Sequence, residues 1–228
     1  MRGGPFVRLW VVSLGLLIAG MSSGCGEAPP VDISLLTGEP CAPPCWQELA
    51  PGESTEDEVA GFIRTSRYVD PRTVYRGDMS RGGKVVGVGI QWRSTAADSR
   101  GVDSNIFDIE GGLLQSITIY PDCDVSLQDL LQKYGGPDKF TAHVEGVEHP
   151  YVAVTLYYPT HGFTADLQLP PDDTSLRPDS KVVRVWYFRA APIRRFIQLG
   201  CDLGYWSSTP EEWLQFARDW QGYATIHP

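Results

Sequence analysis

The sequence predicts an α+β fold in which an antiparallel sheet, or more than one, carries helices packed on one side. Three observations lead to this prediction. Short runs of alternating apolar and polar residues, typical of half-buried strands, recur along most of the chain. The 24 glycines and 18 prolines supply turns between these runs. Two helix starts, each followed by a series of such runs, favour tandem helix-plus-meander repeats.

Residues 1–24 have the pattern of a lipoprotein signal peptide. Two arginines precede the apolar run Leu9–Met21, and Ser23 and Gly24 stand directly before Cys25. This order predicts export, cleavage after residue 24 and a lipid such as palmitate on Cys25. The run of 13 residues is too short for a membrane-spanning helix, which needs about 20. The alternative is an ordinary secretory signal cut nearby, which leaves Cys25 as a thiol.

Charge excludes some partners of the exported chain. The signal contains two of the 19 basic residues and none of the 28 acidic ones, so its removal takes the net charge from −9 to −11. An acidic surface repels nucleic acid and anionic lipid headgroups. We therefore expect no nucleic-acid partner, and a membrane contact made through the lipid on Cys25. Residues 25–40, rich in proline, glycine and acids, are expected to form a flexible tether.

Four further cysteines remain once Cys25 is set aside, namely Cys41, Cys45, Cys123 and Cys201. An even number in an exported chain favours two disulfides, and three connectivities are open. We prefer Cys41–Cys45 together with Cys123–Cys201, because the second bond would hold the C-terminal segment against the middle of the domain. A zinc site is disfavoured, since the spacing matches no usual zinc-binding pattern.

Residues 41–122 are predicted to form the first repeat, a helix followed by strands. Ser54 is the expected N-cap, because acidic residues and then apolar residues at helical spacing follow it. The helix should end before Asp70, since Pro71 disfavours helix in the residue before it. Strands are expected at Thr73–Arg76, Lys84–Trp92, Asn105–Ile109 and Leu113–Tyr120, and a turn at 77–83.

Residues 123–190 are predicted to repeat this order. Ser126 is expected to cap a helix over Leu127–Lys133, which the glycines at 135 and 136 end. The strands expected after it are Lys139–Val144, Tyr151–Tyr158, Gly162–Leu169 and Lys181–Phe188. Similar landmarks in the two halves are separated by 66 to 72 residues, which supports a tandem repeat.

Residues 191–228 form a C-terminal segment with a predicted tryptophan-rich helix. Its start combines a cap, a proline and two acids over 208–212, and its expected end is Gly222. One apolar stripe is expected on this helix, made of Trp213, Phe216, Ala217 and Trp220. Such a stripe is typical of a packing face against the sheet.

Two short motifs resemble a known group of proteins. PGESTEDEV (Pro51–Val59) resembles the helix start of small outer-membrane-assembly lipoproteins of the SmpA/OmlA (BamE-like) type, and LLQKYGGPD (Leu130–Asp138) is similar to their helix end. The resemblance implies helices on a small antiparallel sheet, a unit that beta-lactamase-inhibitor-like proteins hold in tandem. It also implies protein–protein contact at the envelope without catalysis. CAPPCWQELAPGEST resembles the start of many uncharacterised bacterial lipoproteins, which implies no activity.

Motifs for metal or catalytic chemistry are weak. A possible ligand group is His143, Glu145, Glu148 and His149. We expect these residues to be solvated in a hairpin turn, because no spacing on a helix or strand fixes them. The aspartates at 122, 124 and 129 suggest a calcium loop, but Leu127 and Lys133 replace its glycine and its glutamate. The sequence has no GxSxG, HExxH or phosphate-binding motif, and we expect no cofactor and no metal.

The predicted function is a lipid-anchored protein on the extracytoplasmic side of a bacterial cell membrane. There it would act as a non-enzymatic protein-binding or assembly module for an envelope protein. Two alternatives stay open. An exported hydrolase of envelope polymers would be favoured by a deep pocket that gathers His161 with acids. An inhibitor-like module would instead block a secreted enzyme through aromatic loops.

Overall fold

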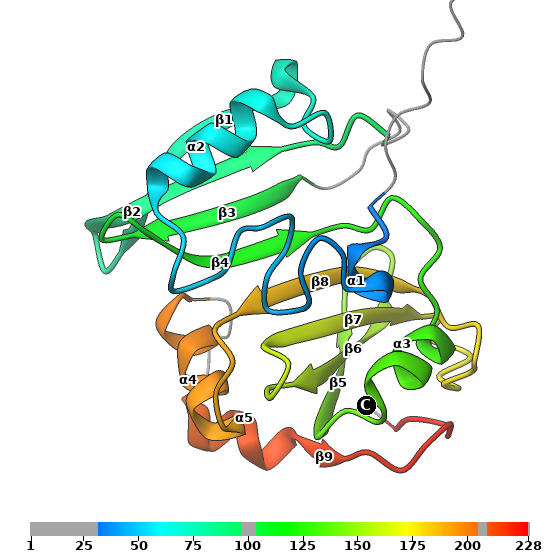
Figure 1. The fold of residues 1–228 in the computed structure, drawn as a ribbon. Helices are drawn as coiled ribbons and strands as arrows, with labels where there is room; N and C mark the ends of the chain where they lie inside the picture. Colours follow the sequence, from blue (N-terminus) through cyan, green and yellow to red (C-terminus); the bar gives the residue numbers. More distant parts are fainter. Residues whose placement is uncertain (1–31, 97–103, 205–208, 228) are drawn as a thin grey trace, which may run out of the picture.

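The computed structural model describes residues 32–96, 104–204 and 209–227, and a nine-stranded antiparallel sheet forms its centre (Figure 1). The strand order is β1-β2-β3-β4-β8-β7-β6-β5-β9. The strands are β1 (Tyr75–Arg81), β2 (Lys84–Trp92), β3 (Asn105–Glu110), β4 (Leu113–Ile119), β5 (Lys139–Glu145), β6 (Tyr151–Tyr158), β7 (Phe163–Leu169), β8 (Val182–Phe188) and β9 (Arg218–Asp219). The α+β prediction is therefore confirmed.

The two halves of the sheet repeat one order of elements. Helix α2 (Glu56–Thr65) precedes the meander β1 to β4, and helix α3 (Leu127–Tyr134) precedes the meander β5 to β8. The last strand of each meander pairs with the other, antiparallel, with Ile117 opposite Tyr187. This pairing relates the halves by an approximate two-fold axis between β4 and β8 (Figure 1).

One face of the sheet packs against the first three helices, beginning with α1 (Ser34–Thr37). Leu35 of α1, Val59 of α2 and Leu130 of α3 are buried in one large apolar cluster with strand residues from both halves. Within it, the rings of Trp46, Trp92 and Phe107 lie 5.6 to 6.0 Å apart, measured between centroids. Burial of this apolar surface from water is the main force that holds the helices to the sheet.

The other face packs against two C-terminal helices, α4 (Ile193–Asp202) and α5 (Pro210–Phe216). Successive strand residues point to opposite faces, so Tyr158 and Tyr187 join the large cluster while Tyr157 and Phe188 point the other way. There they meet Phe196 of α4 and its neighbours in a second cluster. The sequence prediction placed helices on one side and did not include α4. None of the helices in the described ranges is long and apolar enough to cross a membrane.

The segment expected as a tether is already packed from Asp32 onward. Leu35 is 6% exposed, and the hydroxyl of Tyr134 on α3 donates to its carbonyl oxygen. The indole N–H of Trp46 donates to the carboxylate of Asp32. Residues 32–40 thus belong to the folded body, whereas 25–31 lie outside the described residues.

The N-caps of α2 and α3 lie at or next to the residues that the sequence predicts. The N-cap of α2 is Thr55 rather than Ser54, and it exchanges hydrogen bonds with Glu58 in a capping box. Ser54 instead accepts a hydrogen bond from the N–H of Ala50. Ser126 caps α3 as predicted, again through a capping box, here with Asp129.

The predicted tryptophan stripe is wrong. Helix α5 ends at Phe216, because the chain then turns extended to pair as β9 with β5. Trp213 consequently packs in the second cluster, while Trp220 packs against the first, with its ring 6.2 Å from that of Phe140. Phe216 is 64% exposed.

The turn predicted at 77–83 is mostly strand. β1 runs to Arg81 and only Gly82 and Gly83 form the tip, both with positive φ. Thr73, expected to begin the strand, lies in a short 3-10 helix, Pro71–Thr73.

One of the two preferred disulfides is present. Cys41 and Cys45 are joined, whereas Cys123 and Cys201 do not form a disulfide with each other. The reason is their position, since Cys123 packs against the first cluster and Cys201 against the second, on opposite faces of the sheet. Partial burial raises the pKa of both thiols.

Candidate functional site

A polar pocket of about 170 Å³ lies on the face of the sheet that carries α4 and α5. It is formed by β5 to β8 together with the residue that follows β4, and we call it the β5–β8 pocket. Its lining residues are Tyr120, Glu145, Tyr151, Ala153, Asp166, Leu167, Gln168, Val183 and Arg184. Ala153 lies between Tyr151 and Thr155 on this face of β6, and its small side chain leaves room above the sheet.

An ion pair forms one wall of the pocket. The Nε of Arg184 on β8 lies 2.7 Å from Oδ2 of Asp166 on β7, and the hydroxyl of Thr155 donates to Oδ1 at 2.7 Å. Burial raises the pKa of Asp166, and the Arg184 guanidinium opposes that rise. Arg184 also lies over the ring of Trp186, 4.5 Å from its centroid.

A second group of bonded side chains forms the opposite wall. The hydroxyl of Tyr151 donates to Oε2 of Glu145 at 2.5 Å, and Nε2 of His143 lies 2.7 Å from Oε1. Partial burial acts to raise the pKa of Glu145, but the hydrogen bonds from Tyr151 and His143 leave it below its ordinary value. The same hydrogen bond raises the pKa of Tyr151.

The chemistry of the pocket follows from these bonds. Glu145 is ionised at neutral pH, because its pKa is lowered, so it is poorly suited to donate a proton. Both oxygens of Asp166 already accept hydrogen bonds from Thr155 and Arg184. The pocket therefore presents fixed donors and acceptors and is better suited to binding than to acid–base chemistry.

The first half of the sheet has an aspartate at the equivalent place. Asp108 on β3 and Asp166 on β7 each stand directly before an irregularity in strand register. Asp108 faces Ser116 on β4, as Asp166 faces Arg184 on β8. Asp108 is 6% exposed, its Oδ2 accepts from the hydroxyl of Ser116 at 2.8 Å, and burial raises its pKa to about 6.

The metal-ligand group considered from the sequence divides into two pairs. His143 and Glu145 lie on β5 and bond to each other, while Glu148 and His149 are exposed in the connection to β6. In the described ranges, no group of three or more His, Cys, Asp or Glu side chains is placed to hold a metal ion. His161 packs against the rings of Tyr134 and Phe163 and is not part of the pocket lining.

The three aspartates considered for calcium also separate. Asp129 caps α3, Asp122 accepts from the hydroxyl of Ser94 at 2.5 Å, and Asp124 pairs with Lys181 at 2.7 Å. Cys25, the predicted lipid site, lies outside the described residues.

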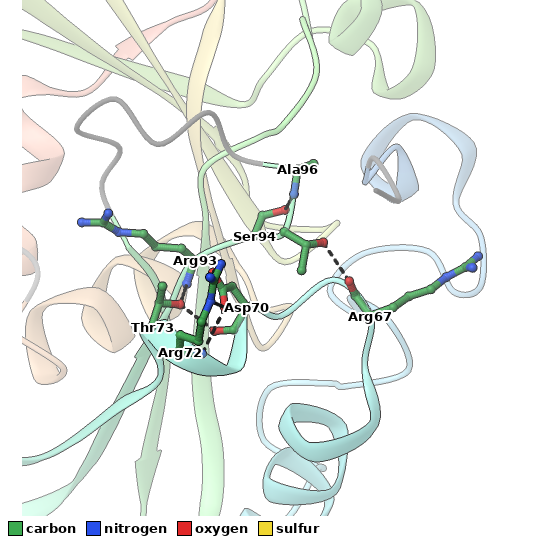
Figure 2. Close-up of polar contacts among 8 residues, drawn as sticks. Arg67, Asp70, Arg72, Thr73, Arg93, Ser94 and Ala96 are labelled. Carbon is green, nitrogen blue, oxygen red and sulfur yellow. Dashed lines mark hydrogen bonds and ion pairs between the residues drawn. The ribbon is translucent and has the colours of Figure 1, made fainter. Parts of the chain in front are cut away.

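In a second polar region, hydrogen bonds join the segment that follows α2 to the residues that follow β2 (Figure 2). The hydroxyl of Thr95 donates to the carbonyl of Arg67 at 2.8 Å, and the N–H of Arg93 donates to the hydroxyl of Thr73 at 2.9 Å. Arg72 bonds Asp70, two residues earlier, with a side chain that is 87% exposed. These contacts act mainly between neighbouring loops, so we interpret this region as structural.

Sequence reasoning missed Asp166, Thr155 and Arg184 as members of one site. A signal was present, because Asp166 and Arg184 are single charges inside apolar strand runs, where an unpaired charge is costly. A scan against protein-family models gives no match, and comparisons with curated proteins and with solved structures give none either. The resemblance to SmpA/OmlA-type lipoproteins therefore stays a prediction.

Proposed function

We propose that this protein is a lipid-anchored extracytoplasmic envelope protein that acts as a non-enzymatic protein-binding or assembly module. The order of basic residues, apolar run and cysteine supports attachment through a lipid on Cys25. The acidic net charge supports the same route, because charge alone would not hold the chain at an anionic surface. The described chain is packed from Asp32 onward, a few residues after Cys25 in the sequence.

The observation that carries the binding role is that, in the described ranges, the cluster that α4 and α5 form on one face of the sheet includes no residue of β1 or β2. In the second half of the sheet, α4 and α5 pack against this face at Tyr157 and Phe188. In the first half, the same face carries Gly77 and Gly89, which lie opposite each other in register. Because the two glycines, which we call the glycine floor, have no side chains, larger side chains can lie close against the sheet above them.

Two larger side chains lie on this floor. The ring of Tyr75 covers Gly77, where a Cβ would come within 2.9 Å of it, and Tyr75 is 64% exposed. Met79 covers Gly89 with its Cγ at 3.5 Å from the corresponding Cβ position. Tyrosine and methionine are enriched where proteins meet, since both provide contact area with adaptable or amphipathic side chains. We call this surface the Tyr75–Met79 face.

Capture from detergent-solubilised envelopes tests this role. Tyr75→Asp should lose the partner, because it places an unpaired charge in a desolvated contact. Val147→Asp is the matched control, since Val147 is fully exposed at 100% in the connection between β5 and β6. Equal capture by both variants, or turnover of an envelope polymer by the purified chain without a partner, would contradict the proposal.

A separate experiment tests the anchor. Cys25→Ser should move the protein from the membrane fraction to the soluble fraction and abolish incorporation of labelled palmitate. Cys123→Ser is the control, because that thiol is partly buried in the folded body. Continued membrane association of Cys25→Ser would contradict lipid anchoring.

A further inference from the structure

We propose that the β5–β8 pocket binds a neutral, hydroxyl-rich ligand, namely one unit of a saccharide. This inference concerns a different part of the sheet from the Tyr75–Met79 face and does not depend on the protein-binding role. It rests on the shape of the pocket, on the balance of charge in its walls and on the bonds that hold its polar groups in place.

The shape is set by a single small residue between larger ones. Ala153 forms the floor, and the phenol rings of Tyr120 and Tyr151 stand among the lining residues. The pocket has a volume of about 170 Å³. Such a recess suits a small ligand that enters it better than the flat surface of a partner protein. Phenol rings also offer apolar surface to the C–H groups of a sugar ring while their hydroxyls remain polar.

The walls carry charges of both signs, two carboxylates and one guanidinium, so an anion is disfavoured most and a cation still lies against a like charge. Arg184 is paired with Asp166 at 2.7 Å, and Glu145 adds a further carboxylate to the lining. A cation in the pocket meets the Arg184 guanidinium, and an anion meets both carboxylates. A hydroxyl group avoids both penalties, because it can donate to a carboxylate oxygen and accept from a guanidinium N–H.

The polar groups keep bonding capacity beyond their internal bonds, which include contacts of Arg184 with Tyr120 and of Tyr151 with Gln168. A guanidinium has five N–H donors; Arg184 gives its Nε–H to Asp166 and also bonds Tyr120, which leaves further N–H groups for a ligand. Each carboxylate oxygen can accept more than one hydrogen bond, so Glu145 can bond a ligand while it accepts from Tyr151. The exposed amide of Gln168 adds one group that both donates and accepts.

Internal bonds also preorganise the site. Thr155 holds Asp166 from one side at 2.7 Å, and His143 holds Glu145 at 2.7 Å. Groups that are already fixed lose little conformational freedom on binding, which favours a small ligand with several hydroxyls. The structure thus offers a rigid polar recess whose chemistry matches a neutral sugar.

Calorimetric titration of the mature full-length protein in detergent tests this proposal. The probes are maltotriose and N-acetylchitotriose as neutral sugars, with glucose 6-phosphate and spermidine as charged competitors. We expect saturable binding of at least one neutral sugar. Ala153→Met should weaken that binding about tenfold or more, because it fills the recess and removes no polar group.

Val144→Met is the matched control, since Val144 on β5 is 59% exposed and its side chain is not part of the lining. It should bind the sugar as the parent does. Gln168→Ala provides a second variant on an exposed position that leaves the fold intact. Unchanged binding in both Ala153→Met and Gln168→Ala would overturn the location of the site.

Failure of both neutral sugars to bind, or tighter binding of spermidine or glucose 6-phosphate, would overturn the ligand class. Capture of a partner through Tyr75 is measured separately, so failure of one proposal leaves the other distinguishable. A parent protein that captured no envelope partner but bound the sugar would contradict only the binding role of the Tyr75–Met79 face.

Discussion

Asp108 and Asp166 occupy equivalent places in the two halves of the sheet, yet their surroundings differ. Each aspartate is 6% exposed and stands before a register irregularity. Asp166 has Thr155 on one neighbouring strand and Arg184 on the other. Asp108 has Gly89 and Ser116 at the corresponding positions.

This difference shows that the backbone sets where the carboxylate lies, while side chains on the neighbouring strands decide how strongly its ionised form is stabilised. An arginine and a threonine stabilise the ionised form in the second half. Burial raises the pKa of both carboxyl groups; Arg184 and Thr155 oppose the rise at Asp166, whereas only Ser116 opposes it at Asp108, whose pKa rises to about 6. Thr155 and Arg184 help to form a polar pocket in the second half, whereas Gly89 in the first half belongs to the glycine floor.

The largest expected effect comes from removing the arginine of the second half. Arg184→Met leaves Asp166 buried without its countercharge, and we expect a loss of about 3 kcal/mol in the free energy of unfolding. Urea denaturation at pH 7 measures this loss. The double variant Asp166→Asn, Arg184→Met should recover most of it, because no unpaired charge remains. A loss below about 1 kcal/mol for the single variant would show that the pair is weakly coupled.

A change of opposite sign is expected for the aspartate of the first half. The pKa of Asp108 is raised by burial, so its contribution to stability is fully present below its unfolded pKa near 3.8 and is lost as the pH rises towards about 6. Asp108→Asn should therefore stabilise the protein by about 2 kcal/mol at pH 7.5 and have little effect at pH 3.5.

Unfolding curves at those two pH values measure the Asp108 effect. Asp166→Asn is the matched control and should destabilise at pH 7.5, since it leaves the partly buried Arg184 guanidinium without its countercharge. If Asp108→Asn destabilises the protein at pH 7.5, the ionised Asp108 side chain stabilises the fold, which contradicts the prediction.

Gly89→Thr would give the first half the threonine found in the second. A Cβ at this position lies 3.7 Å from Oδ1 of Asp108 and 3.5 Å from Cγ of Met79, both ordinary contacts. A hydroxyl that donates to Asp108 should add about 1 kcal/mol at pH 7 and lower the pKa of the carboxyl group.

Carboxyl NMR titration together with thermal unfolding measures both consequences of Gly89→Thr. Gly87→Ala is the contrasting variant, because its Cβ would lie 2.0 Å from the carbonyl oxygen of Ile109. That variant should be strongly destabilised. An unchanged pKa of Asp108 in Gly89→Thr would disprove the proposed equivalence with Thr155.

The smallest expected effects concern the two helix caps. Thr55 and Ser126 each form a capping box at the start of the helix that opens their half. Thr55→Ala and Ser126→Ala should each cost about 1 kcal/mol, measured by chemical denaturation. A cost confined to one of them would show that the two helices do not contribute equally to the fold.

The regular elements were well predicted because their signals are local. Lys84–Trp92 and Tyr151–Tyr158 match β2 and β6 in both bounds, since alternation and turn residues define them. Helix α3 begins at its predicted residue, because Ser126 and Asp129 form a cap that is readable from four residues. By contrast, α4 has Pro192 before it and no side-chain cap, so a search for caps does not find it.

Long-range arrangement was predicted less well. Trp213 and Trp220 share a helical spacing in the sequence, but β9 pairs with β5 and places them on opposite faces of the sheet. Cys123 and Cys201 are separated in the same way. The candidate pocket also needs Tyr120, which follows β4, to lie beside β8, and that neighbourhood follows from the pairing of β4 with β8 rather than from any motif.

Site-specific photo-cross-linking in intact envelopes tests the proposed protein-binding role most directly. A photoreactive phenylalanine analogue replaces Tyr75 on the glycine floor in one sample and Val147 in the opposite half in another; the two positions are 64% and 100% exposed. We expect one discrete cross-linked protein adduct at position 75 and none at position 147. Equal labelling at both positions, or no adduct at position 75, would contradict a binding role for the Tyr75–Met79 face.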